Sequence, residues 1–179
     1  MGRERKLESV PFADDINHLI LKVGEILSWV YALLIVVILM QVILRKGFSN
    51  GLIVLEELQW HLYAIGVMMG LSYSQVNDSH VRVDLFYDRY SPRVRHVIEI
   101  LGMLFFVFPM LFVVIYHSMD FVKDSFRIME SSVMSSGLPY RYLIKSIIPI
   151  SLTLLGVACL TRLYSEIVLL IQGNRSHGA

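Results

Sequence analysis

The sequence has few charged side chains and only one cysteine. Of its 179 residues, 17% are charged and 55% are hydrophobic, and the mean hydropathy is +0.60. Such an apolar composition is unusual for a soluble domain and indicates a membrane protein. The single cysteine, Cys159, cannot form an internal disulfide. A thiol-exchange membrane enzyme needs cysteine pairs, so that class is not expected.

An excess of charge of one sign is also missing. The net charge is only +1, and no basic platform with interleaved aromatic residues is visible, so we expect no nucleic-acid partner. The basic N-terminus is followed by Asp14 and Asp15 instead of the apolar segment of a signal peptide. We therefore expect the N-terminus to be retained.

Long uncharged runs dominate what is present. They cover residues 26–44, 58–77, 100–119 and 146–161. About 20 helical residues span the roughly 30 Å hydrocarbon core of a bilayer, so the first three runs are long enough by themselves. The fourth gains length if Lys145 and Arg162 extend their charges to the two interfaces. The sequence predicts an all-α membrane protein with four transmembrane helices, at about residues 24–44, 55–76, 92–119 and 140–171.

The segments outside these runs predict one membrane domain, residues 24–171, with short flanking parts. Apolar residues recur at helical spacing between positions 12 and 27, so residues 1–23 are expected to form a cytoplasmic or interfacial lead-in with an amphipathic helix. Pro109 is expected to kink the third span. Residues 120–130 keep helical spacing and read as a helical extension or a surface helix. Residues 172–179 form a polar cytoplasmic tail.

The distribution of basic residues predicts the orientation. The 16 Lys and Arg residues are more numerous in the N-terminal region, the second loop and the C-terminus than in the first and third loops. Because cytoplasmic loops of membrane proteins carry the excess of positive charge, both termini are expected in the cytoplasm. Glu56 and Glu57 then lie near the external face.

The second predicted span carries the residues most open to a functional reading. Glu57 and His61 are four residues apart and share one face of this helix, and ionisable groups at the membrane boundary are functional candidates. Gly66, Gly70 and Ser74 form a stripe of small residues that lets another helix approach closely. We interpret these five residues as an interface for helix packing or for a partner. A proton relay is disfavoured because no further Asp, Glu, Lys, Arg or His occurs between His61 and Asp78.

A compact polar segment, His80-Val81-Arg82-Val83-Asp84, follows that span. An extended backbone would place the side chains of His80, Arg82 and Asp84 on one side, and a helical turn would pair His80 with Asp84. One imidazole and one carboxylate are a poor metal site, so no metal is expected. We interpret the segment as a cytoplasmic structural signature that holds the second and third spans in register.

A haem-bearing or quinone-linked membrane anchor of a redox enzyme is the alternative. The predicted topology places His61 and His117 toward the external side of antiparallel helices, and a b-type haem needs such a pair. Both histidines adjoin an aromatic residue at interface depth, which favours an interfacial role. We therefore expect no cofactor.

The order of these elements resembles the small membrane subunit of tripartite ATP-independent periplasmic (TRAP) transporters, the DctQ-type family. The resemblance rests on Glu56-Glu57, on Gly66 and Gly70, on the segment from His80 to Asp84, and on Glu130-Ser131-Ser132, Gly137-Leu138-Pro139 and Ile148-Pro149. It covers the chain from the first span onward. The long charged third loop and His61 depart from the simplest pattern of the family.

The resemblance implies a non-enzymatic, multi-pass protein of the bacterial inner membrane. Such a subunit forms a stable heterodimer with a large TRAP membrane subunit, which imports an organic acid anion together with sodium. A periplasmic substrate-binding protein delivers the anion and contacts the membrane subunits transiently. The small subunit itself binds no substrate, contacts membrane lipids and acts as a scaffold.

Overall fold

All regular secondary structure in the described residues is helical. A computed structural model describes residues 11–77 and 90–175. Its elements are α1 (Pro11–Gly47), α2 (Ile53–Val76), α4 (Pro92–Gly102), the π-helical turn η1 (Met103–Val107), α5 (Phe108–Arg127) and α6 (Arg141–Arg175). The all-α prediction is confirmed for this part of the chain.

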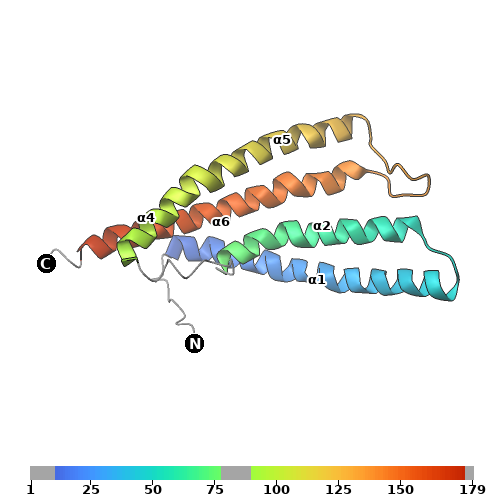
Figure 1. Ribbon diagram of the computed structural model, residues 1–179, viewed down its shortest axis with the longest axis horizontal. Coiled ribbons are helices and arrows are strands. Elements are labelled where there is room, and N and C mark those ends of the chain that lie inside the picture. The colour runs from blue at the N-terminus through green and yellow to red at the C-terminus, as the bar shows by residue number, and fades with distance from the viewer. Residues whose placement is uncertain (1–10, 78–89, 176–179) are drawn as a thin grey trace.

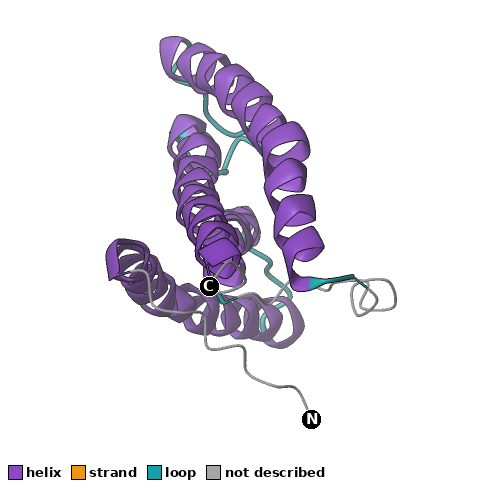
Figure 2. Ribbon diagram, turned by 90° about the vertical axis from the view of Figure 1, so that its left-hand side faces the viewer, coloured by secondary structure: helices purple, strands orange, loops and turns teal. Residues whose placement is uncertain are grey.

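Helix α6 is the centre of the bundle. It packs against α1, α2, α4 and α5, while α1 and α2 form an antiparallel hairpin of their own. Figures 1 and 2 show α6 between that hairpin and the long rod made by α4, η1 and α5. The start of α1 and the end of α6 lie at one end of the bundle, and the connections α1–α2 and α5–α6 lie at the other (Figure 1).

A small cluster of buried apolar side chains lies within the α1–α2 hairpin. Leu34, Val37 and Leu62 are buried there, with Val30, Leu55 and Leu58 packed against them. Many large apolar side chains elsewhere are exposed, Phe106 by 77% and Trp29 by 75%. An exposed apolar surface of this extent is suited to lipid or to another subunit and not to water.

Three described stretches of helix are long and apolar enough to cross a membrane: Ala13–Gly47, Arg93–Arg127 and Arg141–Ile171. Helix α2 is missing from this set, although its 24 residues reach about 36 Å. Its first turns carry Glu56, Glu57, Gln59 and His61, which lower its apolarity. Three of the four predicted spans therefore have the length and composition of membrane helices, and the second span stays a prediction.

The part of the predicted lead-in that the structure describes, from Pro11, forms one continuous helix with the first span. Helix α1 runs through Gly24 without a break; a single glycine costs only about 1 kcal/mol in a helix interior. Ala13 and Ile20 are buried against the bundle, and the Asn17 amide oxygen accepts a hydrogen bond from Thr161 Oγ1 of α6 at 2.8 Å. Part of the lead-in thus packs on protein, and an interfacial role for it stays a prediction.

The expected disturbance at Pro109 takes the form of a π-helical turn. Proline lacks the N–H that would bond the carbonyl one turn earlier, and η1 directly precedes it with a wider turn. Figure 1 shows the rod bending between α4 and α5. Residues after Met119 continue α5 to Arg127, so the helical-extension reading of the third loop's first half is confirmed.

Candidate functional site

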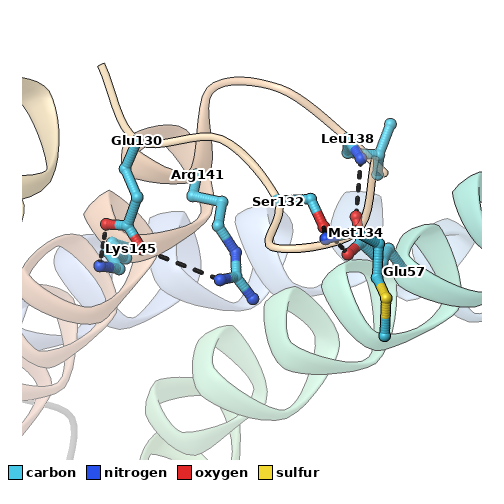
Figure 3. A network of polar contacts seen from close by, with 7 residues as sticks. All are labelled: Glu57, Glu130, Ser132, Met134, Leu138, Arg141 and Lys145. Carbon is cyan, nitrogen blue, oxygen red and sulfur yellow. Dashed lines mark hydrogen bonds and ion pairs between the residues drawn. The ribbon is translucent and has the colours of Figure 1, made fainter. Parts of the chain in front are cut away.

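The α5–α6 loop, residues 128–140, folds over the first turns of α2 and is tied there by Glu57. The Leu138 backbone N–H donates to Glu57 Oε2 at 2.7 Å, and the Ser132 hydroxyl donates to Glu57 Oε1. Both carboxylate oxygens therefore face the loop (Figure 3). Hydrogen bonds to an ionised acceptor are stronger than neutral ones. Glu57 thus joins α2 to a segment more than 70 residues away in the chain.

The loop is also folded on itself. The Ser132 N–H donates to the Leu138 carbonyl at 3.1 Å and the Gly137 N–H to the Met134 carbonyl at 3.0 Å. Met129 and Tyr140, near the two ends of the loop, have φ values of 47° and 61°. Such left-handed conformations are unfavourable for residues with side chains and persist where surrounding contacts impose them. The loop therefore has a defined conformation, and the backbone is constrained near both of its ends.

Gly137 is required by the close approach of the loop to Glu57. A Cβ atom at this position would overlap Ser132 and lie 2.7 Å from Glu57 Oε2. The Gly137 backbone conformation itself is ordinary, since its φ is not positive. Lack of space, and not backbone freedom, selects glycine here.

A second carboxylate, Glu130, fixes the loop to the start of α6. Lys145 Nζ donates to Glu130 Oε2, and Arg141 Nη1 lies 3.8 Å from Glu130 Oε1. The Lys145 ammonium also lies 4.0 Å from the centre of the Phe121 ring of α5, a favourable cation–π geometry. Chiefly because of the Lys145 hydrogen bond, the pKa of Glu130 is lowered from its usual value.

The Glu130 contact predicts an acid-sensitive loop. A carboxyl with a lowered folded-state pKa stabilises the fold above the ordinary glutamate value of about 4.3, and the contribution disappears as the pH falls through the folded value. In detergent, the wild type is expected to exceed Glu130→Gln in Tm at pH 7, and the difference should vanish at the acid end of a titration. A constant difference at every pH would contradict this assignment.

His61 lies one turn after Glu57 on α2, as the spacing predicts, and its interface role stays a prediction. The hydrogen bonds to Glu57 come from the loop, while His61 lies half-buried one turn further along α2. His117 is exposed on α5 and packs edge-to-face on Tyr116. Helix α5 packs on α6, and α6 in turn packs on α2.

The stripe of small residues divides into two parts. Gly66 is buried against α1, where an added Cβ would lie 2.6 Å from Tyr31 Cζ. Gly70 has no atom within 4 Å of such a Cβ, and Ser74 is half-buried. Gly66 therefore serves packing inside the chain. A role of Gly70 and Ser74 toward a partner stays a prediction.

A further close approach, at Gly24, was not foreseen from the sequence. Its Cβ position is occupied by the Tyr73 ring of α2, with Tyr73 Cγ at 3.0 Å. Gly24 and Gly66 thus accept Tyr73 and Tyr31 reciprocally across the α1–α2 contact. Each contact joins a glycine of one helix to a tyrosine of the other, and residues so far apart in the sequence form no motif from which the contact could be predicted.

Polar contacts at the opposite end of the bundle join α4 to α6. Arg162 bonds Glu99 through Nη2 at 3.1 Å and Nε at 3.2 Å, and His96 Nδ1 bonds the buried Glu166. The contacts cross between helices because both partners face the seam. His80, Arg82 and Asp84 lie outside the described residues.

The two polar clusters hold elements of the fold together. At the α5–α6 end, Glu57 and Glu130 are engaged by hydroxyl, amide or cationic donors of the same chain. At the other end, Glu99 pairs with Arg162 and Glu166 contacts the His96 ring across neighbouring helices. Groups paired in this way hold helices and the loop in fixed positions.

Comparison with known proteins agrees with this architecture. A family model described as "Tripartite ATP-independent periplasmic transporters, DctQ component" matches residues 34–169, from the middle of α1 nearly to the end of α6. No curated protein matches the sequence.

Proposed function

The chain belongs to the family of DctQ components of tripartite ATP-independent periplasmic transporters, and from this we propose that it is the small permease subunit of a sodium-coupled transporter of the bacterial inner membrane. It forms a stable heterodimer with a large membrane subunit that imports an organic acid anion. A periplasmic binding protein delivers that anion. The small subunit is the scaffold of the pair and performs no chemistry.

The observation that carries the scaffold role is the pairing of polar groups beside bare apolar faces. Glu57 and Glu130 are engaged by the chain's own loop and helix α6. Phe105, Phe106, Met110 and Phe112 on the outer rod are exposed by 70% to 77%. A rigid bundle with an apolar exterior supports a second membrane protein through packing, because lipid gives no hydrophobic drive for association.

The proposed orientation has both termini in the cytoplasm. The first residues of α1 and the last of α6 share one end of the bundle (Figure 1). By sequence, the two terminal segments and the connection between α2 and α4 carry the larger share of Lys and Arg. The α5–α6 loop then faces the periplasm. Its tip presents the exposed side chains of Val133 (89%) and Met134 (57%), which offer the periplasmic binding protein an apolar contact on a fixed loop.

Co-purification tests this function. The tagged chain, extracted from its own cells in mild detergent, is expected to elute with one larger multi-helix membrane protein in equal amounts. A Soret band in the same fraction, lost on replacing His61 or His117, would instead establish the redox-anchor alternative. Elution of the chain with no membrane partner would contradict the heterodimer.

A further inference from the structure

A groove of about 310 Å³ lies on the outer side of the α1–α2 hairpin. Leu34 and Ile38 of α1 and Gln59, Trp60 and Tyr63 of α2 line it. Trp60 is exposed by 68% and Tyr63 by 54%, so two large aromatic rings stand at its rim. Tryptophan and tyrosine favour the level of the lipid headgroups, where an apolar body and a polar tip are both accommodated.

Gln59 gives the groove an unused hydrogen-bond donor. Its Nε2 atom is buried and has no acceptor within the described residues. An unpaired buried amide is unfavourable. Because Gln59 lines the groove, an oxygen of a molecule bound there could pair this nitrogen after rotation of the side chain. A purely hydrocarbon occupant would leave the donor unpaired.

Charged residues of both signs continue the groove toward the nearer end of the bundle. On α1, Arg45 is exposed and lies seven residues beyond Ile38, hence on the same face and about 10 Å along the axis. On α2, Glu56 is exposed and precedes Gln59 by three residues and Trp60 by four, again on one face. An apolar slot thus leads to one cation and one anion on opposite walls.

We propose that this groove binds one membrane phospholipid whose headgroup carries both a phosphate and a primary amine. An acyl chain lies on Leu34 and Ile38 between the aromatic rings, ester or phosphate oxygens accept from Gln59, the phosphate pairs with Arg45, and the amine pairs with Glu56. The inference goes beyond the proposed function, since it requires only that α1 and α2 lie in a bilayer.

The two tryptophans of the chain make the test direct. In Trp29→Phe, Trp60 is the single reporter at the groove. The full chain is reconstituted in phosphatidylcholine vesicles containing increasing amounts of phosphatidylethanolamine or of phosphatidylcholine, each brominated on its acyl chains. Half-maximal quenching of Trp60 fluorescence is expected at a mole fraction of brominated phosphatidylethanolamine about one-third of that needed with brominated phosphatidylcholine. A preference of this size is in keeping with partly exposed charge contacts.

Three variants connect the preference to the groove. Glu56→Gln should abolish it, and Gln59→Met should weaken quenching by both lipids while leaving the helical circular-dichroism signal unchanged. Trp60→Phe is the matched control, because it leaves Trp29 as reporter and should show no headgroup preference. Equal quenching of Trp60 by the two lipids would overturn the proposal. So would protection of Trp60 from both lipids after addition of the large subunit, which would assign the groove to a protein helix.

Discussion

Replacing Gly137 with valine is expected to release the α5–α6 loop from α2. The added side chain would overlap Ser132 and approach Glu57 Oε2, so the hydrogen bonds of Glu57 to Ser132 and Leu138 could not persist. Overpacking of this kind typically costs about 1–3 kcal/mol. In a chain of this length that loss lowers Tm by roughly 5 °C. Sodium-driven uptake by the assembled transporter should fall as well, because the loop would no longer present a fixed surface.

Hydrogen exchange at Leu138 is the specific readout. Its amide is protected by Glu57 in the wild type and should exchange faster in Gly137→Val. Glu57→Leu should expose the same amide, and the double variant should be little worse than either single one, because both changes break the same contact. Gly47→Val, at the same end of the bundle, is the control, since nothing lies within 4 Å of its Cβ position. Unchanged Leu138 protection in Gly137→Val would contradict the assignment.

Replacing Gly24 with leucine is expected to separate the first half of α1 from the last turns of α2. The Cβ atom alone would meet the Tyr73 ring near its root, at Cγ and Cβ, 3.0 and 3.1 Å away. Rotation of the tyrosine cannot clear an obstruction so close to its own backbone, so the helices themselves must move. The expected cost is again about 1–3 kcal/mol, with loss of the compact hairpin.

A spin-label pair on α1 and α2 would report the separation as an increased distance in Gly24→Leu. Gly70→Leu is the matched control on the same interface, because no atom lies within 4 Å of its Cβ position. It should leave the isolated chain unchanged and weaken association with the large subunit if Gly70 faces that partner. An unaltered distance in Gly24→Leu would contradict the packing described for this interface.

The sequence was sufficient for the helical class because long uncharged runs leave few other structures for a backbone in lipid. It also identified Glu57 as a residue of consequence, since a carboxylate at a membrane boundary needs a partner. Its hydrogen-bond partners could not be predicted, because Ser132 and Leu138 reach Glu57 through the folding of a distant loop.

Contacts between helices were beyond reach of a single sequence. Arg162 with Glu99 and His96 with Glu166 depend on the rotation of α4 and α6 about their axes, which spacing within one helix does not determine. Gly24 and Gly66 differ from Gly70 only in what the neighbouring helix places opposite them. The polar start of α2, by contrast, was visible in the sequence, and it is the feature that separates α2 from the three most apolar stretches of helix.

The central claim is that this chain is a structural subunit and that transport takes place in its partner. Sodium-driven uptake of the organic anion should be measured in proteoliposomes that hold the large subunit alone, this chain alone, or both, each with the periplasmic binding protein added. The account predicts uptake only when both membrane subunits are present. Full uptake by the large subunit alone, or any uptake by this chain alone, would contradict it.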